Sequence, residues 1–128
     1  KLMIKRNSGS IINISSTYGV VGPDHRIYEG MPFNSLPSYA ASKAGVHGLT
    51  RWMATYYGNK GIRVNTLVPG GVENNHDPVF IKRYSERTPL GRMAQPKDMI
   101  GMILYLSSDL SNYATGQQFF IDGGWSAI

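Results

Sequence analysis

Cysteine, long apolar runs and an acidic excess are all absent from this sequence, and each absence narrows what the protein can be. A chain without cysteine forms neither disulfides nor thiolate metal sites. No stretch approaches the ~18 consecutive apolar residues of a membrane-spanning helix, and no apolar signal core follows the first residues, so we expect no membrane partner and a cytoplasmic location. Because 41% of the 128 residues are hydrophobic, the chain can bury the core of a globular domain.

The balance of charge is basic, with 13 Lys and Arg against 8 Asp and Glu and a formal net charge of +5. Such an excess can attract an anionic partner, either a nucleic acid or a phosphate-bearing cofactor. The basic residues are scattered, however, and aromatic residues do not alternate with them as they do on surfaces that stack bases. We therefore interpret the basic residues as a solvated surface and expect no nucleic-acid partner.

The histidines and serines do not form the common arrangements of metal sites or hydrolases. His25, His47 and His76 are widely spaced, and no two of them share a helical turn, so we predict no metal site. The sequence also lacks the Gly-x-Ser-x-Gly motif that presents the nucleophile of many hydrolases. We therefore do not expect a Ser-His-Asp hydrolase.

Short apolar runs alternate with longer helical patterns along the chain. The runs over residues 10–15, 62–68 and 117–121 are typical of strands, and the first is so continuously apolar that we expect it to be buried on both faces. Helices are predicted over residues 38–57 and 95–106, each beginning next to a proline. This order predicts an α/β fold with a parallel sheet, in which the first strand has one edge without a neighbour.

The helix predicted over 38–57 has an apolar face, which we expect to be heavily packed. The residues that recur there at helical spacing are Val46, Leu49, Trp52, Met53 and Tyr56. The glycines and prolines of residues 17–37 predict a long loop with at most short helical turns. A short helix is predicted over 78–87 within the polar stretch 73–93, and the first residues resemble the last turn of a helix.

The central chemical signal is Tyr39 followed four residues later by Lys43. Residues four apart share one face of a helix, so the Lys43 ammonium should lie near the Tyr39 phenol. A positive charge about 4 Å away, at an effective dielectric constant of about 20, stabilises a phenolate by about 4 kcal/mol at most. Tyr39 would thereby become a better base. Tyr56 and Lys60 repeat the spacing at the predicted helix end, where we assign them a structural role.

Four other motifs surround Tyr39 and Lys43 in a definite order. Asn-Ile-Ser-Ser closes the first predicted strand at Ser16, Gly-Ile-Arg-Val-Asn opens the second, Pro-Gly-Gly follows it, and Asp-Gly-Gly stands near the last residue. With this set the chain resembles the C-terminal part of the short-chain dehydrogenase/reductase family, most of all its bacterial sugar-type members. The resemblance implies that residues 1–128 are the C-terminal portion of a Rossmann-like, doubly wound parallel sheet, and that the N-terminal dinucleotide-binding half of the same domain is missing.

The resemblance also implies roles for individual residues. Tyr39 exchanges a proton with the substrate oxygen, Lys43 also binds the nicotinamide ribose, and Ser16, which matches the family's second strand-end serine, holds the substrate oxygen. The residues implied to pass beside the nicotinamide ring are Pro69, Gly70, Gly71 and Val72, with the backbone of Val72 facing the carboxamide. Each of these roles has a structural alternative. Ser16 could be only a turn residue, and the two glycines could form only a tight turn. Tyr39 and Lys43 could be an ordinary surface pair.

Two segments near the implied site bear on the substrate. The gap between Ser16 and Tyr39 is longer than in relatives, and residues 23–33 fill it with polar side chains suited to a polyhydroxylated substrate. These are Asp24, His25, Arg26 and Glu29. The alternative is a loop that only covers a neighbouring segment. Residues 73–93 resemble the family's substrate-binding flap, although Glu73 and two asparagines stand where many relatives have a threonine.

The function that the resemblance implies for the full-length protein is hydride transfer between NAD or NADP and a secondary alcohol or ketone, with a small polar molecule such as a sugar or sugar derivative as substrate. A homotetramer or homodimer is implied as well. The candidate interface residues, which could equally be core, are Trp52, Met53, Phe119, Phe120 and Trp125. Two alternatives are a catalytically silent binding or regulatory protein on the same scaffold, and a fragment that is inactive without the phosphate-binding turn.

Overall fold

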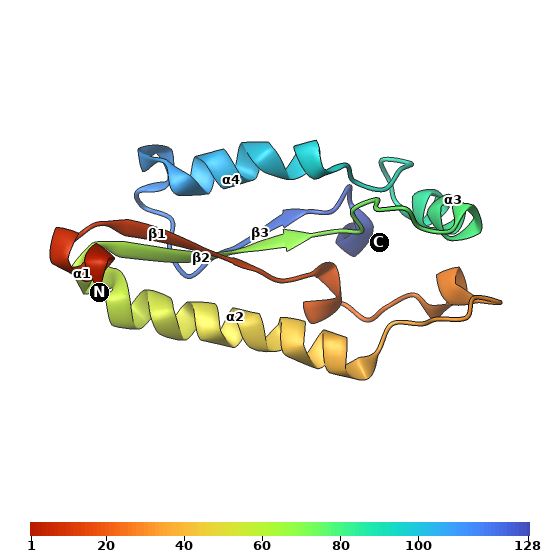
Figure 1. The fold of residues 1–128 in the computed structure, drawn as a ribbon, viewed down its shortest axis with the longest axis horizontal. Helices are drawn as coiled ribbons and strands as arrows, with labels where there is room; N and C mark the ends of the chain where they lie inside the picture. The colour runs from red at the N-terminus through yellow and green to blue at the C-terminus, as the bar shows by residue number, and fades with distance from the viewer.

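Three parallel strands lie between two layers of helix in the computed structural model, which describes every residue of the chain (Figure 1). The strands β1 (Gly9–Ile14), β2 (Ile62–Pro69) and β3 (Gln118–Ile121) are neighbours in that order and all run parallel. The long helix α2 (Pro37–Tyr57) covers one face of the sheet and α4 (Ile100–Ser107) covers the other. The predicted α/β architecture is confirmed.

The central strand is β2, and its position explains its burial. Gly9 to Ile14 of β1 pair with residues 62–67, and residues 66–69 pair with β3 on the other side. β2 is therefore largely buried, as a strand covered by helices on both faces should be. The prediction that the first strand is buried on both faces is wrong. Its residues are mostly half-buried and Ile14 is 48% exposed, because the outer edge of β1 has no neighbouring strand.

The helix α2 begins and ends where the sequence predicts. Pro37 occupies its first turn, and the chain leaves it through Gly61, whose φ of 67° is a conformation that favours glycine. Only part of the predicted apolar face packs against the sheet: Met53 contacts the cluster that contains Ile62 and Val64 of β2. Leu49, Trp52 and Tyr56 are each more than half exposed. The residues of α2 that are buried instead are His47, Thr50 and Ala54.

Small and polar residues bring α2 close to the sheet. Thr50 Oγ1 accepts hydrogen bonds from Asn13 Nδ2 at 2.9 Å and from Thr66 Oγ1 at 2.7 Å. Ala54 packs with Ile62 and Val64 in a small apolar cluster. Because each of these side chains is short, the helix axis can approach the strands closely, and the larger aromatic residues are left on the outer side.

The remaining elements are short. Residues Leu2–Arg6 form α1, and two 3-10 turns, Thr17–Gly19 and His25–Tyr28, lie in the long loop after β1. The helix α3 spans Pro78–Arg87 as predicted, and its first amides are capped by the carboxylate of Asp77. The predicted helix over 95–106 begins with a 3-10 turn before α4, because Gln95 and Asp98 form a capping box around Pro96.

The largest apolar cluster lies beyond the carboxyl ends of the strands. It joins the loop after β1, α3 and the last turn of the chain, and consists of Ile27, Phe80, Tyr84, Met93 and Trp125. Trp125 is fully buried, so within the chain it is a core residue. The segments around the carboxyl end of the sheet are therefore held together by their own hydrophobic core.

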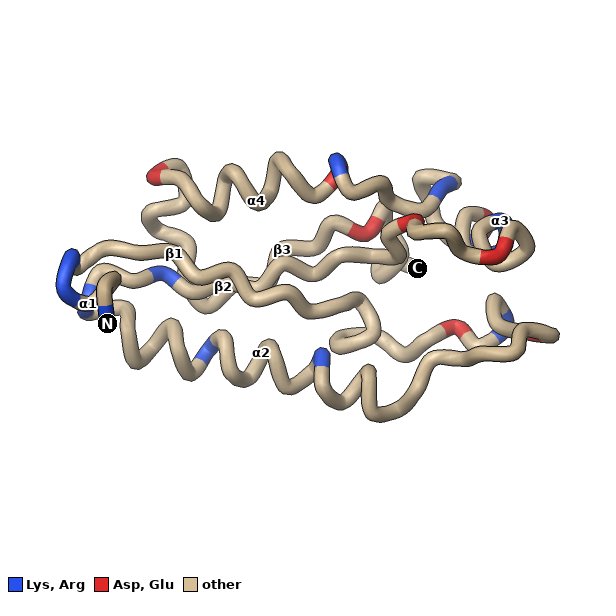
Figure 2. The backbone as a smooth tube through the Cα atoms, in the orientation of Figure 1, with Lys and Arg blue, Asp and Glu red and all other residues tan.

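Charged residues are distributed over the whole chain, with no single basic face (Figure 2). Lys and Arg gather at α1 and recur along α2, and around α3 they lie beside Asp and Glu. None of the helices has the length and apolarity needed to cross a membrane.

Candidate active site

A cleft of about 600 Å³ lies at the carboxyl ends of β1 and β2. In open parallel sheets, ligands commonly bind at this edge, where the loops after the strands meet. The residues that the sequence implied for the site come from three separate segments, and all of them line the cleft. They are Ser16, Tyr39, Lys43, Pro69, Gly70, Gly71 and Val72. The fold thus brings the complete predicted set together.

Tyr39 and Lys43 lie in the first turns of α2 and point to the same cleft. Lys43 Nζ is 5.7 Å from the centre of the Tyr39 ring and donates a hydrogen bond to the carbonyl oxygen of Ile14 at 3.2 Å. An ammonium has three N–H donors, so two remain for a bound molecule. The Tyr39 side chain is 43% exposed and its hydroxyl has no hydrogen-bond partner in the chain. This phenol is available for proton exchange beside a fixed positive charge.

The two serines after β1 have different environments. Ser15 is buried, and its hydroxyl donates to the carbonyl of Lys43 at 2.8 Å and lies 2.9 Å from His47 Nε2. Ser16 is half-buried, and its Oγ accepts a hydrogen bond from the amide of Tyr18, so it caps the 3-10 turn. Its own O–H remains free to donate toward the cleft. Ser15 therefore links β1 to α2, while Ser16 can contact a ligand.

The glycines after β2 are required by close packing. A Cβ on Gly70 would lie 2.8 Å from Asp122 Cα, and a Cβ on Gly71 would lie 2.6 Å from the Tyr84 ring. The amide of Gly71 also donates a hydrogen bond to Tyr84 Oη at 2.5 Å. Neither glycine has a positive φ, so close packing rather than a tight turn explains them, and the same packing fixes this segment against α3.

The backbone of Val72 has unused hydrogen-bonding capacity. Ala94 N donates to Gly71 O at 2.9 Å, and Glu73 N donates to Ala94 O at 2.8 Å, which makes a short parallel bridge. In extended backbone the groups of successive residues point to opposite sides, so those of Val72 face away from Ala94. The Val72 N–H has no partner in the chain, and Val72 lines the cleft. This amide is a free donor beside the site.

Sequence reasoning missed the aromatic walls of the cleft. Tyr28 Oη donates to Tyr18 Oη at 3.2 Å, and both rings line the cleft. Burial is the main cause that raises the pKa of Tyr18 and of Tyr28, and it raises the pKa of Tyr84 to about 12. The other aromatic and imidazole side chains of the walls are Phe33, His76 and Phe80. The position of Tyr18, two residues after Ser16, was a signal that could have identified it.

The polar side chains of residues 23–33, the insertion between Ser16 and Tyr39, do not line the cleft, which corrects the expectation that they would face the substrate. Asp24 is paired with Arg26 and Arg87, and His25 Nδ1 lies 3.0 Å from Asn34 Oδ1. These groups satisfy one another, so the insertion presents Tyr28 and a stretch of neighbouring residues to the cleft instead. The contacting stretch is Phe33, Asn34, Ser35 and Leu36.

The second Tyr-x-x-x-Lys pair lies far from this chemistry. Lys60 Nζ is 4.0 Å above the centre of the Tyr56 ring, and that ring stacks on Trp52 at 5.0 Å. Neither residue lines the cleft. The structural role that we assigned to Tyr56 and Lys60 agrees with this position.

Comparisons with known proteins agree on one family. The family model described as enoyl-(acyl carrier protein) reductase matches residues 1–126. A flagellin modification protein, Post-translational flagellin modification protein A of Campylobacter coli, is 37% identical over 98% of this chain and 49% of its own length. The chain spans about half the length of the curated relatives it matches.

Solved structures give the same result. A short chain dehydrogenase from Leptospira borgpetersenii with bound NAD+ is 43% identical, with a TM-score of 0.89 over 98% of this chain and 48% of that one. A gluconate 5-dehydrogenase from Burkholderia cenocepacia, in complex with NADP and tartrate, is 32% identical, with a TM-score of 0.87 over 99% of this chain and 48% of that one.

Proposed function

The chain belongs to the short-chain dehydrogenase/reductase family, and from that premise we propose that the whole protein transfers a hydride between NAD or NADP and a secondary alcohol or ketone. The observation that carries this proposal is the convergence of Ser16, Tyr39 and Lys43 on one cleft with the segment 69–72. We further propose that the part of the protein outside residues 1–128 completes the dinucleotide-binding domain and holds the phosphate-binding turn.

The residues at the cleft suit a nicotinamide cofactor. The unpaired N–H of Val72 can donate to a carboxamide oxygen, and the two remaining N–H donors of Lys43 can bind ribose hydroxyls. The chemistry that such a cofactor supplies is donation or acceptance of a hydride at carbon. The titles of two similar structures name NAD+ and NADP, which supports both as candidates for this protein.

The residues of the chain provide the proton chemistry. In alcohol oxidation Tyr39 accepts the hydroxyl proton of the substrate, and in ketone reduction it returns a proton to the same oxygen. The Lys43 ammonium places a positive charge beside the Tyr39 ring, and its bond to the Ile14 carbonyl keeps it there. The free O–H of Ser16 donates to the substrate oxygen and orients it.

The proposed substrate is a small polar alcohol, with a sugar or sugar acid as the first candidate. The cleft offers hydroxyl and amide groups from Tyr18, Asn34 and Ser35 among aromatic walls, a combination that binds polar molecules with defined orientation. The similar gluconate 5-dehydrogenase was solved with tartrate, which is a polyhydroxylated acid. A site of this kind should reject analogues that lack the hydroxyl groups.

The test uses the full-length protein with a panel of sugars, sugar acids and simple secondary alcohols. Each is combined with NAD+ and NADP+, and formation of the reduced nicotinamide is followed by absorbance. Tyr39→Phe should lower kcat by about 10²–10⁴-fold, because it removes the proton acceptor. Tyr56→Phe, the matched control, should retain turnover. Wild-type protein that binds NADH but turns over no member of the panel would indicate a silent scaffold.

Two further expectations are also proposals. We propose a homodimer or homotetramer, supported by the outer face of α2, where Leu49, Trp52 and Tyr56 are 52%, 58% and 52% exposed. Light scattering of the full-length protein tests this, and a monomer at micromolar concentration would contradict it. We also propose a cytoplasmic location, which cell fractionation can examine.

A further inference from the structure

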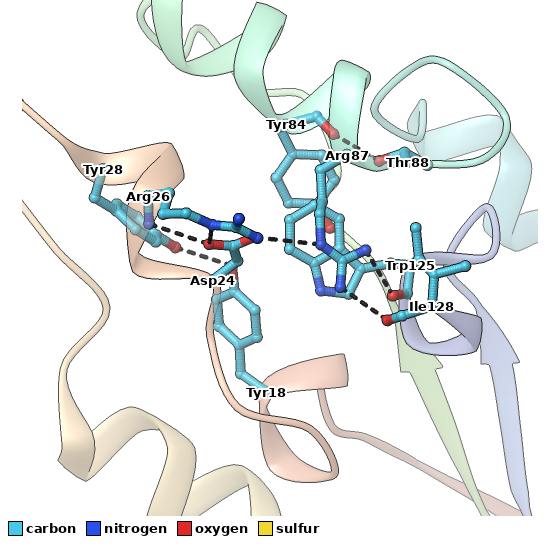
Figure 3. Close-up of polar contacts among 9 residues, drawn as sticks. All are labelled: Tyr18, Asp24, Arg26, Tyr28, Tyr84, Arg87, Thr88, Trp125 and Ile128. Carbon is cyan, nitrogen blue, oxygen red and sulfur yellow. Dashed lines mark hydrogen bonds and ion pairs between the residues drawn. The ribbon is translucent and has the colours of Figure 1, made fainter.

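Arg87, at the end of α3, joins three segments that are distant in sequence (Figure 3). Its Nε lies 3.4 Å from Asp24 Oδ2 in the insertion after β1. Its two terminal nitrogens donate to the carbonyl oxygens of Trp125 at 3.2 Å and Ile128 at 3.0 Å, and its guanidinium lies 4.6 Å from the centre of the Trp125 ring. The side chains of Arg87 and Asp24 are only 23% and 13% exposed, so water screens their interaction incompletely.

Asp24 has two arginine partners, and only one of them connects it to another element. Arg26 donates to both carboxylate oxygens at 2.8 and 2.6 Å, but its side chain is 83% exposed and belongs to the insertion itself. These hydrogen bonds are the main cause that lowers the pKa of Asp24 to about 2, with Arg87 contributing. The Asp24–Arg87 contact is the only ion pair between the insertion and α3.

Asp24 caps the turn that carries Tyr28. The carboxylate of Asp24 accepts a hydrogen bond from the amide of Arg26 at 3.1 Å, and so caps the 3-10 turn that contains Tyr28. At the end of this turn the Tyr28 hydroxyl donates to Tyr18 Oη in the cleft, and the Tyr28 ring lies 5.4 Å from that of Phe80 on α3. Asp24, at the beginning of the 3-10 turn, is therefore paired with Arg87 of α3. Tyr28, at the end of the same turn, lies at the cleft.

We propose that Asp24 and Arg87 are positioning residues, and that their ion pair holds the insertion on α3 so that Tyr28 and Tyr18 form a hydroxyl pair that selects polyhydroxylated substrates. One hydroxyl of the pair donates to the other, so one O–H is left to donate to a substrate oxygen. A phenol has an ordinary pKa of about 10, and burial raises that of both tyrosines, so the pair is protonated at neutral pH. The selection of substrate rests on the proposed dehydrogenase function, whereas the positioning of the insertion does not.

Two substitutions separate the ion pair from its surroundings. Asp24→Asn removes the charge, but asparagine caps a turn as well as aspartate does. Arg26→Gln is the matched control, because it removes the exposed partner of Asp24 and leaves Arg87 in place. Arg87 itself also holds Trp125 and Ile128, so its substitution would affect more than the insertion.

Hydrogen exchange of the full-length protein tests the positioning directly, whether or not a substrate is known. In Asp24→Asn the amides of residues 25–31 should exchange about fivefold faster or more, while those of β2 should not change. In Arg26→Gln the same amides should stay within about twofold of the wild type. Equal effects of the two substitutions, or none in Asp24→Asn, would overturn the proposed role of the ion pair.

Kinetics with the best polyhydroxylated substrate of the panel tests the selection. Asp24→Asn and Tyr28→Phe should each raise KM about fivefold or more, with kcat changed by less than about twofold, because binding but not proton exchange is affected. KM for a simple secondary alcohol should stay unchanged in both. A uniform loss of kcat for all substrates would overturn the selective role. If the wild type has no activity, the proposed function fails, and the exchange experiment still decides on the ion pair.

Discussion

The two ends of α2 carry the same Tyr-x-x-x-Lys spacing in different surroundings. At the first end, Lys43 Nζ is held by the Ile14 carbonyl at 5.7 Å from the centre of the Tyr39 ring, and both residues line the cleft. At the other end, Lys60 Nζ lies 4.0 Å above the Tyr56 ring on the outer surface of the helix. The spacing alone brings an ammonium to a ring in both cases. Only the first pair lies where the loops of two strands supply further polar groups.

The difference comes from what each lysine contacts. The Lys60 ammonium lies over the rings of Tyr56 and Tyr57 at the end of α2. Its charge therefore makes cation–π contacts with neighbouring residues of the chain. Lys43 instead donates to a strand, which keeps its remaining donors directed to the cleft. The Tyr-x-x-x-Lys spacing therefore does not mark a site by itself. At Tyr39 the bond between Lys43 and the strand β1 places the pair at the cleft.

The largest expected effect is a difference in kcat/KM between substitutions of Lys43 and Lys60. Lys43→Ala in the full-length protein should lower kcat/KM by about 10²-fold or more, because the proposed phenolate loses its neighbouring charge and cofactor binding weakens. Lys60→Ala should leave kcat/KM within about twofold and cost less than about 1 kcal/mol of stability, the value of an exposed cation–π contact. Steady-state kinetics and urea unfolding of both variants provide the measurement. Full activity of Lys43→Ala would contradict the assignment.

A second prediction compares the inner and outer faces of α2 with one kind of substitution. Thr50→Val removes the oxygen that accepts hydrogen bonds from Asn13 and Thr66. It should lower the free energy of unfolding by about 1–3 kcal/mol, because a buried donor and a half-buried donor lose their acceptor. Thr55→Val removes an exposed hydroxyl from the same helix, and should change it by less than about 0.5 kcal/mol. Urea unfolding of the two full-length variants gives both values, and equal losses would show that the bonds of Thr50 do not hold α2 on the sheet.

The smallest expected effect is a pH dependence at the inner face. Burial, with a contribution from Arg51, lowers the pKa of His47, so the folded protein binds a proton there less readily than the unfolded chain. The stability from neutral His47 should be complete above about pH 6.5, the value of an unperturbed imidazole, and should decline as the pH falls below it. Thermal unfolding from pH 7.5 to 5 should show a shallower decline in His47→Gln than in the wild type.

The matched control for that measurement is His25→Gln, since His25 is exposed. Its profile should follow the wild type over the whole pH range. A wild-type profile that is flat between pH 7 and 5, or a His47→Gln profile that is steeper, would contradict the assignment of this pH dependence to His47.

The sequence alone determined the order of the elements and the seven residues predicted for the site, but not the aromatic walls around them. Pro37, the strand-like runs and the capping residues act over a few neighbouring positions, so helices and strands could be predicted close to their observed limits. The carboxyl ends of parallel strands meet at one edge of the sheet, so motifs at those ends had to come together. Resemblance to a family supplied their implied roles.

The tertiary structure decided which side of each segment faces inward. The aromatic face of α2 turned outward because short residues such as Thr50 and Ala54 bring the helix closer to the sheet. The polar residues of the insertion turned away from the cleft because Asp24 meets Arg87, which is far from it in the chain. Such contacts depend on the path of the whole chain. No local pattern encodes them, so the pairing of Tyr28 with Tyr18 could not be predicted from the sequence.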